Sequence, residues 1–126
     1  MSMDQLYSII GSVKKWCEEN LPPPVIRRRT TTKVMVYKEV GGEIYGAYTD
    51  KYNWIVINLS VCHNLRMIIR TVIHEYVHAT QDLRDYSKIN KRVGYEKNPY
   101  ELQANKIEQR SYKKCWDEIR GEYTSW

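Results

Sequence analysis

The sequence predicts a single α+β domain over residues 1–126, in which a small three-stranded sheet, antiparallel or mixed, packs on a central helix. Two observations favour this class. Apolar residues recur at helical spacing in the first twenty residues and again after residue 63, whereas β-branched and aromatic residues cluster in short runs between them. A chain of 126 residues is long enough to bury one hydrophobic core.

Residues 4–19 are expected to form an N-terminal helix, because apolar side chains recur there along one face: Leu6, Ile9, Ile10, Val13, Trp16 and Cys17. Asp4 is a suitable N-cap residue for this helix. The three prolines at 22–24 end it and force the chain into an extended stretch.

Three strands are predicted in close succession, over residues 33–40, 43–49 and 54–59. Gly41 and Gly42 mark a tight turn between the first two strands, and residues 50–53 mark a turn between the second and the third. These short connections favour an antiparallel meander, in which each strand pairs with the next one along the chain.

The strongest helical pattern covers residues 63–83, where apolar side chains form a wide face: Leu65, Ile68, Ile69, Val72, Ile73, Tyr76 and Val77. A helix this apolar is expected to be central and largely buried. Residues 84–97 are charged and include Gly94, so a loop or an irregular crossing is predicted there. A C-terminal helix should begin at Pro99, with Asn98 as its N-cap, and run to about Arg120.

The composition limits the class of protein. The longest purely apolar run is four residues, far below the roughly 20 that a membrane-spanning helix needs, and the N-terminus lacks the apolar core of a secretion signal. The three cysteines form no Cys-x-x-Cys pair, so free thiols in a reducing, cytoplasmic compartment are expected. The net charge of +5 permits a nucleic-acid partner, but an ordinary basic surface explains it more simply.

The central helix contains the segment His74-Glu75-Tyr76-Val77-His78. Histidines four residues apart lie on the same helix face, so both imidazoles can reach one metal ion, for which Zn²⁺ is the expected cofactor. The Glu75 carboxylate can then act as general base toward a water molecule that zinc activates. The simpler alternative is two unrelated histidines, but two imidazoles near a core need a polar partner or a metal.

The third metal ligand has several candidates in the sequence. His63 is the only other histidine, and it lies about 16 Å from His74 along a helix axis, too far to share the metal. Glu101 is preferred, because a C-terminal helix that returns across the central one would bring it to the metal. Together with Asn98, Glu101 would also suit a capping box, in which it only satisfies backbone amides. The alternative acidic ligands are Asp82, Asp85, Glu96 and Glu108.

Further roles follow for residues around this site. Asn105 lies one turn after Glu101 and is expected to hydrogen-bond the outer nitrogen of a zinc-binding histidine. A tyrosine is the expected donor to the oxyanion that forms during hydrolysis, with Tyr86, Tyr95 and Tyr112 nearest to the site in sequence.

These residues resemble the gluzincin metallopeptidases, which combine His-Glu-x-x-His on one helix with a glutamate on the next. The segment Glu101-Leu102-Gln103-Ala104-Asn105 resembles the Glu-x-x-Ala-Asn stretch of ImmA/IrrE-type peptidases, and residues 74–81 resemble small phage-encoded zinc peptidases. The likeness covers residues 33–110. In many gluzincins an aspartate stands at the position of Asn105.

The resemblance implies a minimal zincin fold and a zinc-dependent endopeptidase that acts on a protein or peptide substrate. Its zinc ligands would be His74, His78 and Glu101, and its general base Glu75. The resemblance also implies that residues 54–58 form an edge strand, which pairs with an extended peptide substrate. A phage-encoded enzyme of this kind would act in the cytoplasm of the host cell.

Two other functions fit the sequence. The first is a zinc-stabilised module without catalysis that binds peptide or nucleic acid, with the basic residues 27–33 in contact with the partner. The second is a helical interaction protein that binds no metal. The presence of Glu75 favours the peptidase, because a pure binding site has no need of a carboxylate at that position.

Overall fold

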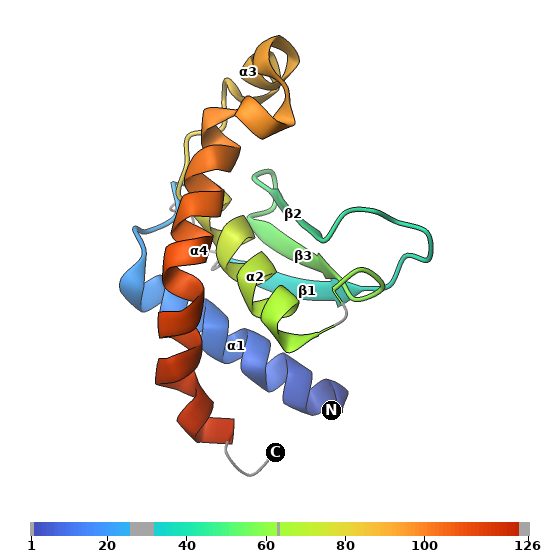
Figure 1. The fold of residues 1–126 in the computed structure, drawn as a ribbon, viewed down its shortest axis with the longest axis vertical. Helices are drawn as coiled ribbons and strands as arrows, with labels where there is room; N and C mark the ends of the chain where they lie inside the picture. The colour runs from blue at the N-terminus through green and yellow to red at the C-terminus, as the bar shows by residue number, and fades with distance from the viewer. Residues whose placement is uncertain (1, 26–31, 63, 124–126) are drawn as a thin grey trace.

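The computed structural model describes residues 2–25, 32–62 and 64–123, and Figure 1 shows how they are arranged. The α+β class is confirmed. Short 3-10 turns precede and follow the last helix, at Tyr95–Lys97 and Arg120–Tyr123. The longer elements follow in this order: α1 (Met3–Asn20), β1 (Lys33–Tyr37), β2 (Gly46–Thr49), β3 (Trp54–Asn58), α2 (Leu65–Ala79), α3 (Tyr86–Val93) and α4 (Pro99–Ile119).

The N-cap of α1 is Ser2, so the prediction of Asp4 was wrong. The Ser2 hydroxyl accepts the backbone N–H of Gln5, and the Gln5 side chain accepts the backbone N–H of Ser2. This reciprocal capping box satisfies two free donors at once. Asp4 lies instead in the first turn, where its negative charge is favourable beside the helix N-terminus.

The three strands form a mixed sheet in the order β1-β3-β2. β1 pairs in parallel with β3, and β2 pairs antiparallel with β3. The predicted meander was therefore wrong, because only β2 and β3 form a hairpin, and residues 38–45 carry the chain from β1 to the far edge of the sheet.

The middle place of β3 has a physical reason. β3 is the most buried strand, and its Ile55 and Ile57 are fully buried, so it gains most from neighbours on both sides. The prediction that residues 54–58 form an edge strand was wrong for the same reason. The edge strand beside α2 is β2, which contacts that helix directly.

The core lies around α2, which contacts the sheet, α1 and α4 (Figure 1). Ile69, Val72 and Ile73 of α2 are fully buried, as the apolar pattern predicted. Full burial of such a side chain contributes about 1.5–3 kcal/mol to stability. Among the described helices, none is both long enough and apolar enough to cross a membrane.

Helix α3 occupies residues for which a loop or an irregular crossing was predicted. None of its described side chains is fully buried. Its apolar residues Tyr86, Ile89 and Val93 recur at helical spacing and are half-buried, but the helix is only eight residues long, so the pattern is short and easily missed among the charged residues around it. It ends at Gly94, which adopts a φ of 83° and donates its backbone N–H to the carbonyl of Asn90. Glycine adopts a positive φ without the steric cost that a Cβ atom brings, so it can end the helix here.

Candidate metal centre

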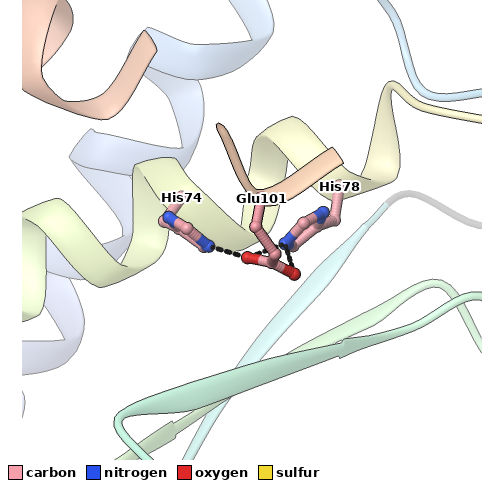
Figure 2. Close-up of side chains that lie close together, drawn as sticks. All are labelled: His74, His78 and Glu101. Carbon is pink, nitrogen blue, oxygen red and sulfur yellow. Dashed lines mark hydrogen bonds and ion pairs between the residues drawn. The ribbon is translucent and has the colours of Figure 1, made fainter. Parts of the chain in front are cut away.

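Two histidines of α2 and one glutamate of α4 converge on one point (Figure 2). The Nε2 atom of His74 lies 2.9 Å from Oε1 of Glu101. The Nε2 atom of His78 lies 3.2 Å from Oε1 and 3.1 Å from Oε2 of the same carboxylate. All three residues are buried, so the group is largely shielded from water.

The start of α4 places Glu101 at this point. Asn98 is the N-cap, as predicted, and its side chain accepts the backbone N–H of Tyr100. Glu101 then lies in the first turn, facing α2. Ala104 follows one turn later and is fully buried, and its small side chain lets the two helices approach closely.

The alternative in which Glu101 only caps α4 was wrong. In a capping box the Glu101 carboxylate would accept the backbone N–H of Asn98. That N–H donates instead to the backbone carbonyl of Tyr95, and the Glu101 carboxylate contacts the two histidines. The helix is capped by the Asn98 side chain alone, which leaves Glu101 free for another role.

The three side chains fit a metal ion. His74, His78 and Glu101 each offer one ligand atom, and these atoms lie within 4.8 Å of one another. The outer Nδ1 atoms face acceptors: that of His74 lies 3.2 Å from Oε1 of Glu108, and that of His78 lies 2.7 Å from Oε1 of Gln81. Such acceptors fix a proton on Nδ1, so the Nε2 lone pair of each neutral ring is available to a metal.

Glu108 and Gln81 occupy the positions for which Asn105 was predicted. Asn105 lines the cavity beside the site, but its side chain is exposed and makes no hydrogen bond with a described histidine. The reason is helical geometry. Seven residues make nearly two full turns, so Glu108 stays closer to the face of Glu101 than Asn105 does at four residues.

Glu108 also links the site to Arg70, which sequence reasoning missed. The Nε atom of Arg70 donates to Oε2 of Glu108 at 2.6 Å. Arg70 lies one turn before His74 on the same face of α2, and that spacing was the available signal. Burial alone would raise the pKa of Glu108, but hydrogen bonds from His74 and Arg70 lower it below its usual value.

The charges in the group stabilise one another. Burial would raise the pKa of the Glu101 carboxyl, but hydrogen bonds from His74, His78 and Tyr86 hold it well below its usual range. Burial would lower the pKa of His74, but its hydrogen bonds to Glu101 and Glu108 raise it above the ordinary value. Because protons and a metal compete for the Nε2 atoms, metal binding releases protons from this site.

Glu75 lies beside the metal-ligand group without joining it. Its side chain is buried and lines the same cavity as the two histidines. Its carboxylate makes no hydrogen bond to any residue that the structure describes. Burial raises the pKa of this carboxyl, and the charges of His74 and His78 offset the effect only in part.

The site opens into a cavity of about 910 Å³. Residues 43–48, in β2 and the segment before it, line one side of the cavity, and side chains of α2 and α4 line the other. Leu83, Tyr86 and Tyr95 also contribute to the lining. A cavity of this size is typical of sites that bind small molecules or short peptide segments.

Two of the three candidate tyrosines are near the site. Tyr86 and Tyr95 line the cavity, and the Tyr86 hydroxyl donates to Oε2 of Glu101. The Tyr86 ring also packs edge-on against His78, with 6.1 Å between the ring centroids. Tyr112 packs instead against the core, with Arg66 and Arg70 over its ring, so it was a wrong candidate.

The other candidate ligands lie away from the metal-ligand group. Asp82 is exposed and pairs with a neighbouring arginine. Asp85 is exposed at the start of α3, and Glu96 is exposed in the 3-10 turn before α4. His63 and Arg27–Arg29 lie outside the described residues.

Comparison of the chain with protein-family models, with curated proteins and with solved structures gave no match. The fold and the site define an α+β protein with a buried histidine, histidine and glutamate group that could hold a metal ion. A function must therefore be argued from the chemistry of this site.

Proposed function

We propose that this protein is a zinc-dependent peptidase, and more narrowly an endopeptidase, with Zn²⁺ held by His74, His78 and Glu101. The observation that carries the proposal is Glu75, a buried carboxylate that lines the cavity beside the ligands and has no hydrogen-bond partner among the described residues. Three protein ligands and an open fourth position are typical of catalytic zinc sites, whereas structural sites are usually closed by four. The likeness of the motif to that of the gluzincins supports the same function.

Zn²⁺ bound at this site would supply Lewis-acid chemistry, which polarises a peptide carbonyl and lowers the pKa of water. Glu75 takes one proton from the attacking water, whose oxygen adds to the carbonyl carbon. Glu75 then gives that proton to the amine nitrogen as the peptide bond breaks. Burial raises the pKa of Glu75, and a raised pKa suits a group that accepts and releases a proton near neutral pH.

Tyr86 is the side chain best placed to stabilise the oxyanion that forms on the carbonyl. Its hydroxyl contacts the Glu101 carboxylate, so it lies within one hydrogen bond of the metal-ligand group. Burial, together with this hydrogen bond to Glu101, raises the pKa of Tyr86 and keeps its hydroxyl protonated as a donor.

The edge of β2 is the surface on which an extended peptide would bind. Within the described part of the chain β2 pairs with β3 only, and its residues 46–48 line the cavity. An unpaired strand edge offers alternating backbone N–H and C=O groups, which bind a peptide with little demand on its sequence. A peptide added there would run past Glu75 and the metal ligands.

Replacement of Glu75 tests the proposed function. Zinc-loaded wild-type protein should cleave peptides from a fluorogenic library, and Glu75→Gln should cleave them about 100-fold more slowly or worse, because general-base catalysis is lost. The zinc content of the variant should match that of the wild type. Glu96→Gln changes an exposed glutamate outside the site and serves as the matched control.

Two results would count against the proposal. Equal cleavage by Glu75→Gln and the wild type would remove Glu75 as the base. Bound zinc with no cleavage of any peptide by the wild type would favour the zinc-stabilised binding module instead.

A further inference from the structure

Arg70 is the only lysine or arginine among the described residues that line the cavity. It lies on α2 one turn before His74, which is about 6 Å along the helix axis. Apart from the two histidines and the tyrosines, the other ionisable side chains of the lining are carboxylic acids: Glu43, Glu75, Glu101 and Glu108. The cavity therefore has one fixed positive side chain, next to the metal-ligand group.

Most of the hydrogen-bonding capacity of Arg70 is unused. Its Nε atom donates to Glu108, and its guanidinium lies over the Tyr112 ring at 5.9 Å from the centroid. The terminal N–H groups have no acceptor among the described residues, and the side chain is 30% exposed. The guanidinium is thus held on one side by Glu108 and Tyr112, while its outer donors are available to a bound molecule.

Resting on the proposed peptidase function, we infer that Arg70 binds a carboxylate group of the peptide substrate. The planar guanidinium matches a carboxylate with two parallel hydrogen bonds, and such charge-assisted pairs are among the strongest in proteins. Apart from the proposed metal position itself, Arg70 is the one group of the described lining whose fixed positive charge attracts a carboxylate. Because Glu108 and Tyr112 hold the guanidinium in place, little side-chain freedom is lost on binding.

The distance along the helix limits where this carboxylate lies in the substrate. An extended peptide advances about 3.3 Å per residue, so an offset of about 6 Å from His74 corresponds to one or two residues from the cleaved bond. The carboxylate belongs either to an aspartate or glutamate side chain or to the C-terminus of the peptide. The two sources share the same chemistry and can be separated with matched peptides.

Three peptides test the inference on the zinc-loaded Glu75→Gln protein. The first is a hexapeptide blocked at both ends with one central glutamate, the second has glutamine at that position, and the third is the glutamine peptide with a free C-terminal carboxylate. Fluorescence anisotropy should show that an acidic peptide binds about tenfold more tightly than the neutral one, since a hydrogen bond between charged groups is strong. Tighter binding of the glutamate peptide identifies a side-chain carboxylate as the group that Arg70 binds, and tighter binding of the third peptide identifies the C-terminal carboxylate.

Variants of Arg70 in the same Glu75→Gln background assign the preference to this side chain. Arg70→Gln should abolish it, and Arg70→Lys should reduce it because an ammonium cannot form the paired hydrogen bonds. Arg66→Gln is the matched control, because Arg66 also lies over the Tyr112 ring, at 5.3 Å, but does not line the cavity. Circular dichroism and zinc content confirm that each variant is folded.

Equal affinities for the three peptides, or no binding of any of them, would overturn the inference. A preference that survives in both Arg70 variants would overturn it as well. Because the readout is binding, it is independent of turnover. If the wild-type protein cleaves no peptide but the preference for an acidic peptide persists, only the proposed peptidase function is contradicted. If the wild-type protein cleaves peptides but shows no such preference, only the role of Arg70 is contradicted.

Discussion

Each imidazole of the candidate site is held at both of its ring nitrogen atoms. His74 lies between Glu101 and Glu108, and His78 lies between Glu101 and Gln81. The outer partner fixes the position of the ring proton, and the inner one marks where the ligand atoms meet. Rings that are ordered in advance lose little freedom when a metal binds, so these partners favour binding.

Glu108 should therefore matter for metal affinity. Glu108→Gln keeps the size of the side chain but removes the charge that faces Nδ1 of His74, and it should weaken zinc binding about 10–100-fold. Competition with a chromophoric zinc chelator measures the change. Asn105→Ala is the matched control on the same helix, with an expected change below about twofold. If Asn105→Ala weakened binding as much as Glu108→Gln, the positioning role would belong to Asn105.

The residues of the site differ in how far the sequence predicts them. His74 and His78 were predictable, because a spacing of four residues sets their relation within one helix whatever surrounds it. The prediction of Glu101 as the third ligand required the further assumption that α4 returns across α2. The spacing of seven residues favours Glu108 over Asn105 as the residue on the face of Glu101. That Glu108 reaches His74 also depends on how the two helices cross, and this crossing brings together segments far apart in the sequence.

At the scale of elements, Gly46 lies where β2 packs tightly against α2. A Cβ atom on Gly46 would lie 2.7 Å from Cγ2 of Thr71 and 2.7 Å from the backbone oxygen of Val56. Neither group can easily move, because one lies on the central helix and the other on the middle strand. The absence of a side chain at this position lets β2 lie beside the metal-ligand helix.

Gly46→Ala should destabilise the fold by about 1–3 kcal/mol, because the added methyl overpacks this contact. Gly11→Ala is the matched control, since a Cβ atom there meets nothing within 4 Å and the residue lies within α1. Alanine at that position should stabilise the protein by about 0.5–1 kcal/mol. Urea unfolding followed by circular dichroism measures both changes, and an unchanged midpoint for Gly46→Ala would contradict the close packing of β2 on α2.

The helices could be predicted from the sequence where one side of the helix is buried in the core. α1, α2 and the start of α4 followed from apolar stripes and an asparagine cap, and all three were found. α3 buries no described residue fully, and its apolar face of Tyr86, Ile89 and Val93 spans only two turns, too short to stand out in the sequence. The order of the strands depends on pairing between distant segments. The turn at Gly41 and Gly42 therefore pointed to the wrong neighbour for β1, whereas the turn at residues 50–53 correctly joined β2 to β3.

At the scale of the whole molecule, the metal-ligand group joins the central helix to the C-terminal one. α2 supplies two ligands and α4 the third, while the sheet and α1 cover other faces of α2 (Figure 1). Burial of three ionisable side chains is costly unless they are paired, and here they satisfy one another. A metal at this point would tie the two helices together and add its binding free energy to the stability of the fold.

The most direct test of this account is the metal content of three purified proteins: the wild type, Glu101→Ala and the exposed-site control Glu96→Ala. Each is incubated with zinc, dialysed exhaustively and measured by elemental analysis. The account predicts about one zinc ion per chain in the wild type and in Glu96→Ala, and a marked loss in Glu101→Ala, because two histidines alone hold the metal weakly. Full zinc retention in Glu101→Ala, or a wild-type protein that binds no zinc, would contradict it.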